Sequence, residues 1–373
     1  MPLARRSALM LGAGLALPRS ARAQVGPMEA AFAGWMRQHG VTQGTLALAL
    51  EGRLVHIAGF GGAEATTRVP VWSLSKLVTA LAIARLVGEG KLTLDKTMAQ
   101  AMPQRLTRHG VAAGPIASLT VAQLLTHRSG LPRDAEGESV PGLRALLRAR
   151  APRNVTTDML LSEIINAVPT RPAGTAFIYS NINYYLLGLV VEEAAGQPYA
   201  TYAGREVLGR VGIRNPTMER DWALLGPTGG WSMSGAEYVA LLLRGVAGDA
   251  LIPPAMRAWM NSAEGKTISE GNAAFYALGQ FARLAGRGFN RWHAGAWNFR
   301  MPVWRIDVSA GTFAVLTAAR AAWFVSFSPN PGTAQVAELD RVLYAAHLLE
   351  DAAGRADRLG EFVDVPAGAP HVR

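Results

Sequence analysis

The stretch from Arg68 to Val87 reads RVPVWSLSKLVTALAIARLV, and it holds the most informative pair of residues in the chain. Ser73 and Lys76 stand at positions i and i+3 at the head of an almost uninterrupted apolar run, which predicts a buried helix. On a helix this spacing brings two Cβ atoms to about 5–6 Å, so the lysine amine can contact the serine hydroxyl. The stretch therefore predicts a nucleophile beside a base at the start of a long helix.

The chemistry of this pair depends on its surroundings. A serine hydroxyl is a weak nucleophile unless a neighbouring base removes its proton. A lysine is such a base only when its pKa falls from about 10.4 toward neutrality, and both burial and a helix N-terminus act in that direction. The free N–H groups of a helix N-terminus also hold an oxyanion. Because two residues at this spacing also occur by chance, Ser73 and Lys76 alone do not establish an active site.

A second candidate element is AGTAFIYSNINYY, residues 173–185, where Tyr179 and Asn181 flank Ser180 directly before an apolar helix. A spacing of two places both side chains on one side of an extended segment. A phenol beside a lysine can carry a proton, and a carboxamide can hydrogen-bond a substrate amide or ester. The alternative is an asparagine that caps the helix and a tyrosine that packs in the core.

A third element is NRWHAGAWNF, residues 290–299. On a strand, His293, Gly295 and Trp297 face one way, and the glycine allows close approach of a ligand to the backbone. An exposed edge of this strand would supply a backbone N–H group to an oxyanion. The alternative is a structural histidine, since a lone histidine on a strand is more often structural.

Composition limits the class of protein. The chain has 373 residues, 50% of them hydrophobic, enough for one large globular domain or two closely packed ones. Cysteine is absent, which excludes a disulfide framework, a thiolate metal site and a cysteine nucleophile. No stretch reaches the roughly 18 apolar residues of a membrane span. The net charge of +10 comes without a dense basic run, so we expect no nucleic-acid partner, although contact with an anionic cell envelope is compatible.

Residues 1–23 have the features of an export signal. Arg5 and Arg6 precede an apolar stretch that ends in Ala-Arg-Ala at Ala23. We therefore expect export to the periplasm or the medium, by the general secretory or the twin-arginine route. Removal of this segment takes away four arginines and no acids, so the formal charge falls from +10 to +6.

The rest of the chain predicts two lobes. Both ends contain strand and helix signals: an opening helix with Met28 and Phe32, two strands around a Glu51-Gly52 turn, strands again within residues 291–330, and a closing amphipathic helix. Both ends therefore feed one sheet. We expect an α/β lobe from residues 24–95 and 271–351, an inserted helical lobe over residues 96–270, and a disordered tail over residues 352–373.

The segments SLSK, YSN and HAG, in this order and at these separations, resemble the three motifs of the serine β-lactamase and penicillin-binding-protein superfamily, in its class C β-lactamase-related branch. Residues 86–98, 119–132, 172–199 and 226–242 also look like connecting segments of that family. The resemblance covers nearly the whole mature chain. It implies an α/β (α+β) fold, with an antiparallel sheet flanked by helices, an inserted all-helical lobe, and an active site between the two.

The resemblance also implies roles for single residues. Ser73 looks like the acylated nucleophile, Lys76 its partner, Tyr179 the residue that shares the duty of base, and Asn181 a substrate ligand. His293 and Gly295 belong to the third motif, and the backbone N–H groups of Ser73 and Ala296 would form the oxyanion hole. No metal or organic cofactor is implied.

One departure concerns the third motif, where many members carry lysine and this chain carries His293. A histidine with an ordinary pKa near 6.5 is mostly neutral at pH 7, so we expect weaker recognition of a penicillin carboxylate. The resemblance implies an exported serine hydrolase of a small ester or amide, such as a D-amino acid peptide or a β-lactam. Two alternatives stay open: a penicillin-recognising protein with little turnover, and a non-catalytic module that binds the cell envelope.

Overall fold

The computed structural model describes residues 26–110, 114–133, 156–164, 169–218, 226–248, 250–262, 264–265, 274–301 and 306–359. The expected export signal, residues 1–23, lies outside them. No described helix has the length and apolarity needed to cross a membrane.

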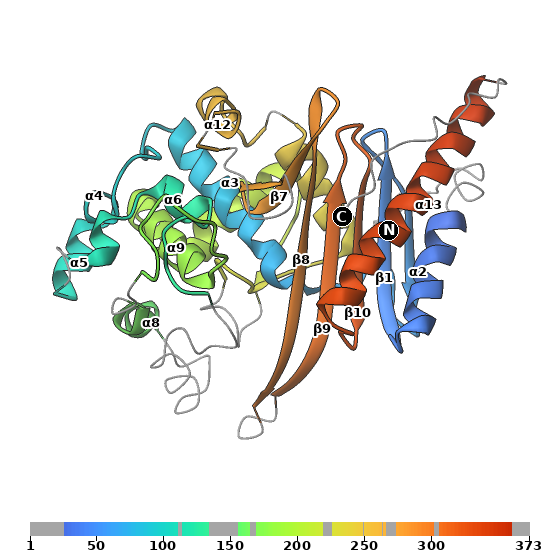
Figure 1. The fold of residues 1–373 in the computed structure, drawn as a ribbon, viewed down its shortest axis with the longest axis horizontal. Helices are drawn as coiled ribbons and strands as arrows, with labels where there is room; N and C mark the ends of the chain where they lie inside the picture. Colours follow the sequence, from blue (N-terminus) through green and yellow to red (C-terminus); the bar gives the residue numbers. More distant parts are fainter. Residues whose placement is uncertain are drawn as a thin grey trace, which may run out of the picture.

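A seven-stranded antiparallel sheet forms the centre of one lobe (Figure 1). Its strand order is β2-β1-β10-β9-β8-β7-β6. Strand β1 pairs with β10, residue 43 with 328 and residue 49 with 322, which confirms that both ends of the chain feed one sheet. The strands are β1 (Gln43–Leu50), β2 (Arg53–Phe60), β6 (Phe275–Ala277), β7 (Gln280–Ala285), β8 (Gly288–Met301), β9 (Ile306–Leu316) and β10 (Ala322–Ser328).

The outer face of the sheet is covered by the opening and closing helices, α2 (Gly26–Gln38) and α13 (Thr333–Leu359) (Figure 1). Their apolar stripes pack on alternate residues of the strands, which confirms the two helices expected from periodicity. The core on this side includes Met28, Phe32, Trp35, Leu46, Leu48, Trp323, Val325, Leu339 and Leu343.

Helix α13 corrects the expected disordered tail, since it continues to Leu359 and makes residues 352–359 helical. These positions are mostly alanine, arginine and leucine, which favour a helix even where few large apolar residues are available for packing. Residues 360–373 lie outside the described part of the chain.

Helix α3 (Ser75–Gly88) lies between the sheet and the helical lobe, directly after the 3₁₀ turn η1 (Trp72–Leu74) (Figure 1). Every residue from Ser75 to Ala84 is buried. A helix that is apolar on all sides is stable only when it is covered on all sides, which explains its central position. The residues at its start are therefore held at the junction of the two lobes.

The helical lobe contains short helices around α9 (Asn181–Ala195), which packs on α3. Threonine capping boxes begin α4 and α6, at Thr97 and Thr120. The others are α4 (Met98–Ala101), α5 (Pro103–Arg108), η2 (Pro115–Ser118), α6 (Val121–Leu125), α8 (Thr157–Ile164), α10 (Tyr199–Ala203), η4 (Gly204–Leu208), η5 (Gly209–Val211), η7 (Leu241–Val246) and α12 (Pro254–Met260).

Helix α11 (Gly235–Ala240) corrects the expected lobe boundary. Residues 235–240 fall inside the range assigned to the helical lobe, yet α11 packs on β1 and β10 of the sheet. Tyr238 contacts Phe324 with ring centroids 5.4 Å apart, and a Cβ atom at Gly235 would lie 2.8 Å from the Ala47 Cβ. The inner face of the sheet needs an apolar cover, and α11 supplies it.

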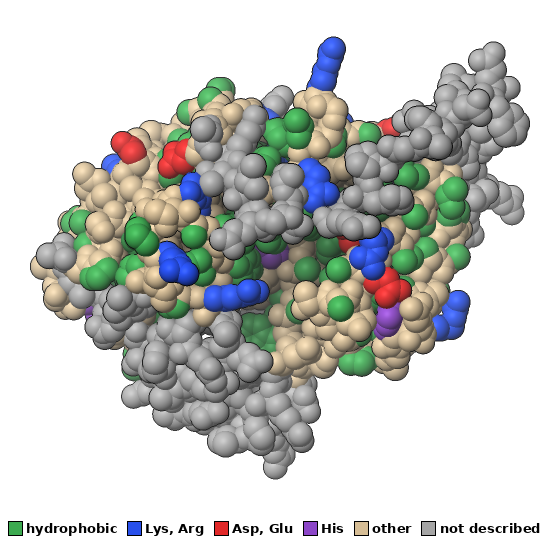
Figure 2. Space-filling model, in the orientation of Figure 1, with side chains coloured by type: hydrophobic (Ala, Val, Ile, Leu, Met, Phe, Trp, Pro, Cys, Tyr) green, Lys and Arg blue, Asp and Glu red, His purple; other side chains and the backbone are tan. Residues whose placement is uncertain are grey.

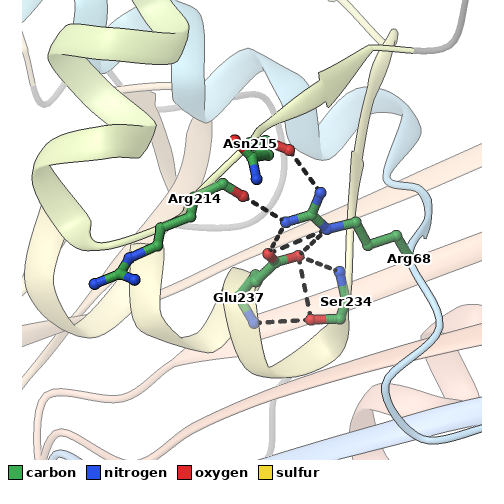
Figure 3. A network of polar contacts seen from close by, with 5 residues as sticks. All are labelled: Arg68, Arg214, Asn215, Ser234 and Glu237. Carbon is green, nitrogen blue, oxygen red and sulfur yellow. Dashed lines mark hydrogen bonds and ion pairs between the residues drawn. The ribbon is translucent and has the colours of Figure 1, made fainter. Parts of the chain in front are cut away.

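A small sheet joins the two lobes near Ser73. Strand β5 (Trp231–Met233) pairs with β3 (Val69–Pro70) and β4 (Thr217–Met218), none of which the sequence predicted. Next to β3, Arg68 forms an ion pair with Glu237, and it donates to the backbone carbonyls of Asn215 and Arg214 at 2.7 and 2.8 Å (Figure 3). Burial opposes the ionised form of Glu237, but hydrogen bonds from Arg68 and Ser234 keep its pKa below the usual value. The network fixes the segment that leads into Ser73.

Candidate active site

Ser73 lies in η1, where the backbone takes an uncommon conformation. The preceding residue, Trp72, has a φ of +48°, a region that large side chains rarely occupy. Its surroundings hold it there: the Val71 N–H donates to the Trp231 carbonyl at 2.9 Å, and the Trp72 ring lies 5.5 Å from that of Trp297. Ser73 itself is only partly buried, so its hydroxyl lies at an accessible position.

Lys76 is fully buried, and its amine contacts three oxygens. The Nζ atom lies 3.1 Å from Ser73 Oγ, 2.7 Å from Asn181 Oδ1 and 3.1 Å from the Thr228 carbonyl oxygen. The structure thus brings together the serine, lysine and asparagine that the sequence placed in two separate motifs. Thr228, in the GPTGG segment at residues 226–230, was not predicted.

These contacts fix where a neutral lysine amine would point its lone pair. The Asn181 Oδ1 atom and the Thr228 carbonyl only accept hydrogen bonds, so they take the two hydrogens of a neutral amine. The third contact is the Ser73 hydroxyl, which can donate. In its neutral form Lys76 is therefore oriented to receive the proton of Ser73.

Tyr179 and Asn181 both face Lys76. The Tyr179 ring centroid lies 5.1 Å from Lys76 Nζ. Asn181 is the first residue of α9, but the N-cap position belongs to Ser180, so Asn181 is not the helix cap of the alternative interpretation. Tyr179 remains partly exposed, whereas the lysine beside its ring is fully buried.

His127 is a residue whose part in this site the sequence did not reveal. Its buried ring lies 4.4 Å from the Tyr179 ring. Its Nδ1 atom accepts from the Ser180 backbone N–H at 3.2 Å and from the Asn183 amide at 2.9 Å. Its carbonyl accepts from the Ile178 N–H at 2.8 Å. His127 therefore holds the Tyr179-Ser180-Asn181 segment on both sides.

Replacing His127 tests this positioning. His127→Phe keeps a ring but removes the acceptor for the Ser180 N–H, and we expect kcat for ester hydrolysis to fall about 10- to 100-fold. His127→Asn offers an acceptor near the Nδ1 position and tolerates the φ of +55° found there, so it should retain much more activity than the phenylalanine variant. Steady-state kinetics of the two purified variants decides this. Equal activity of both would show that the Nδ1 contact has no role.

His293 corrects one prediction. It was expected to contact substrate from the third motif, but its side chain is buried, with 3% of the residue exposed. Its Nδ1 lies 2.6 Å from the Ala294 carbonyl, so Nδ1 carries a proton, and Nε2 then accepts from the Tyr276 hydroxyl at 3.1 Å. Both nitrogens therefore have protein partners. The ring packs 5.9 Å from Tyr179 and supports it, because the inward side of β8 faces an aromatic cluster rather than solvent.

The burial of His293 has a consequence for stability. Burial lowers the pKa of this imidazole to about 3, and nearby Lys76 acts in the same direction, against the hydrogen bond to Ala294. As the pH falls below about 6.5, the imidazole of His293 takes up a proton in the unfolded chain but stays neutral in the folded protein. The free energy of unfolding therefore falls as the pH drops below that value. We expect this group to remove about 2 kcal/mol of unfolding free energy between about pH 6.5 and pH 5.

His293→Gln should make the unfolding free energy less sensitive to pH over this window, measured by urea unfolding at each pH. The wild type, measured under the same conditions, is the reference. Equal pH dependence in the two proteins would contradict the buried neutral state of His293.

Gly295 allows a close approach of the protein's own chain. A Cβ atom there would lie 2.7 Å from the Val71 carbonyl and 2.6 Å from Thr312 Oγ1. The glycine therefore lets β8 lie against η1. Among the described residues β7 pairs with β8 only as far as Trp292, and β8, which carries Ala296, contacts η1 directly before α3.

Comparison with known proteins gives a consistent family. A family model described as beta-lactamase matches residues 28–316. Protein flp from Staphylococcus aureus (strain MW2) is 28% identical over 158 residues, which are 42% of this chain and 29% of that protein. Esterase EstB from Burkholderia gladioli is 32% identical over 146 residues, 38% of this chain and 36% of that protein. The matched regions thus span about a third of these relatives.

A solved structure of the D-stereospecific amidohydrolase from Streptomyces sp. superposes with a TM-score of 0.65 at 20% identity, covering 85% of this chain and 97% of that one. This likeness shows the fold: an antiparallel sheet with helices and an inserted helical lobe. The family model covers most of the chain, including the segments that bring Ser73, Lys76, Tyr179 and Asn181 together. The chain belongs to the beta-lactamase family.

Proposed function

We propose that this protein is an exported serine hydrolase that cleaves a small ester or amide through an acyl-Ser73 intermediate. The observation that carries the proposal is the buried amine of Lys76, held by Asn181 and Thr228 and lying 3.1 Å from the Ser73 hydroxyl. A buried lysine costs stability, so a site that keeps one beside a partly exposed serine is best explained by chemistry.

In the proposed reaction, Ser73 Oγ attacks the substrate carbonyl carbon while its proton passes to Lys76 Nζ. The carbonyl oxygen becomes an oxyanion, which the N–H groups of Ser73 and Ala296 would stabilise. Tyr179 is partly exposed and its ring lies beside Lys76, so it can pass this proton to the leaving group. The bond to the leaving group then breaks and leaves an ester at Ser73.

Release of the acyl group is the reverse process with water as the nucleophile. Lys76, through Tyr179, takes a proton from water as it attacks the acyl carbon, and the proton returns to Ser73 Oγ. Asn181 holds Lys76 through Oδ1, and its amide nitrogen can donate to a substrate carbonyl. The third motif supplies backbone groups and a buried neutral histidine, without a fixed positive charge.

Two observations support esters and amides as the substrate class. EstB is named an esterase and the Streptomyces protein a D-stereospecific amidohydrolase. The neutral His293 lacks the charge that would hold a carboxylate at the third motif, which favours neutral groups at that position.

The basic start, apolar middle and Ala-Arg-Ala end of residues 1–23 support export to the periplasm or the medium.

Intact-mass analysis tests the proposal. The mature protein is incubated with a fluorophosphonate probe, a p-nitrophenyl ester and a cephalosporin, beside Ser73→Ala. We expect one probe adduct per chain, mapped by peptide mass analysis to Ser73, together with turnover of the ester. If no compound forms an adduct at Ser73 and no turnover depends on it, the hydrolase proposal fails, and a binding module without catalysis becomes the better interpretation.

A further inference from the structure

A second feature lies beside the segment that carries Tyr179. A cavity of about 530 Å³ opens at the surface of the helical lobe, lined by Pro132–Arg133, Thr170–Arg171 and Ala176–Ile178. Its wall at Phe177 packs against His127, with ring centroids 5.9 Å apart. Figure 2 shows the molecule hollowed between the helical lobe and the sheet, with basic side chains at the rim on the helical-lobe side.

The cavity is built from two loops that are fixed to each other. The Thr170 N–H donates to the Gly130 carbonyl at 2.7 Å, and the Gly174 N–H donates to the Arg128 carbonyl at 2.7 Å. Gly130 has a φ of +76°, and a Cβ atom there would lie 2.0 Å from the Arg171 carbonyl. The backbones that carry Arg133 and Arg171 are therefore held in fixed positions, although the two side chains are exposed.

The described part of the cavity lining carries positive charge only. It contains two arginines and no acid among the residues that the structure describes. Neither guanidinium forms an ion pair with any residue that the structure describes, whereas Arg68, Arg85, Arg105 and Arg210 each have a glutamate partner. Two guanidiniums in one concave surface favour a ligand with a carboxylate, which arginine binds with paired hydrogen bonds.

We propose that Arg133 and Arg171 form a subsite for a carboxylate carried by the substrate, away from the bond that is cleaved. The inference rests on the proposed function, because it names a substrate class for the same site. Phe177 lines the cavity and Tyr179 lies two residues further along the chain, at most about 7 Å away between Cα atoms. A substrate that extends a few bonds beyond its carbonyl would reach both. The protein would then prefer acidic esters or amides, although its third motif lacks a fixed charge.

The test compares three esters on the wild type and on R133Q/R171Q: p-nitrophenyl acetate, p-nitrophenyl hydrogen glutarate, and 4-acetoxybenzoate. The second has its carboxylate on the acyl side and the third on the leaving group, so they show from which side the subsite is reached. For one of the acidic esters we expect kcat/KM to fall about tenfold in the double variant, and for p-nitrophenyl acetate less than about twofold. Salt should weaken the preference in the wild type.

R53Q, which removes an exposed arginine on β2, is the matched control and should behave as the wild type. A binding measurement separates this inference from the proposed function. Glutaric acid monoanilide, which has no ester to cleave, is titrated calorimetrically into Ser73→Ala, beside its neutral methyl ester. We expect the acid to bind about fivefold more tightly, and this preference to be lost when R133Q/R171Q is added.

Equal losses for acidic and neutral esters, together with no preference for the acid in binding, would overturn the subsite while leaving the hydrolase intact. If the wild type hydrolyses none of the three esters, the hydrolase proposal fails. The binding measurement on Ser73→Ala would then still decide whether the carboxylate subsite exists.

Discussion

Ser73→Ala is expected to lower kcat for p-nitrophenyl ester hydrolysis by about 10³-fold or more, because no other group replaces a covalent nucleophile. The variant should also form no adduct with a fluorophosphonate. Its stability should stay close to that of the wild type, since Ser73 is partly exposed and the hydrogen bond to Lys76 is a small loss. Stopped assays with purified protein and a thermal unfolding curve measure the two quantities separately.

The matched control is Ser118→Ala, which removes an exposed hydroxyl in the helical lobe, far along the chain from the site. It should retain full activity. Turnover by Ser73→Ala at more than a tenth of the wild-type rate, with a folded protein, would exclude Ser73 as the nucleophile.

Lys76→Met is the second change with a large expected effect. Methionine has nearly the length of the lysine stem, so packing around α3 should survive while the amine is lost. We expect kcat to fall by about 10³-fold, because Ser73 loses the group that takes its proton. The rate of fluorophosphonate labelling at Ser73 should fall in parallel, which an ester assay and a labelling time course both record.

The effect of Lys76→Met on stability follows from two opposing changes. Asn181 Oδ1 and the Thr228 carbonyl lose a buried donor, at a cost of about 1–3 kcal/mol each when no water replaces it. The removal of a buried amine offsets part of this cost. Lys91→Met, at an exposed lysine that pairs with Glu89, is the control for the substitution itself. Unchanged labelling of Ser73 in Lys76→Met would exclude the lysine as its base.

The elements that the sequence predicted well are those with a strong local signal. The apolar runs of β1 and β2 on either side of the Glu51-Gly52 turn, and the single buried stripes of α2 and α13, are visible in the local sequence, so the pattern identified them. Strands β6 and β7 were missed, because they are short and are defined by their pairing in the sheet, β7 with β8 and β6 with β7. Helix α11 was assigned to the wrong lobe, since an apolar stripe does not specify which surface it covers.

In the candidate site, too, contacts between residues close in the sequence were predicted and those that depend on tertiary neighbours were not. Ser73 and Lys76 are three residues apart, so helix geometry alone predicted their contact. The roles of His127 and His293 depend on tertiary neighbours: Ser180 and Asn183 for the first, Tyr276 for the second. The one local signal for His127 in the sequence is a histidine directly before an Arg-Ser-Gly turn; the structure gives this position a φ of +55°, which few residue types adopt readily.

The pairing of β1 with β10 has a consequence for how the chain folds. It joins residues 43–49 with residues 322–328, so the middle of the sheet cannot form until nearly the whole chain is available. Contacts of such large sequence separation slow folding, since the connecting chain must lose its freedom before the contacts form. A chain emerging from a ribosome or a translocation pore would therefore keep β1 without its partner until a late stage, and truncation before residue 322 would leave an exposed strand edge prone to aggregation.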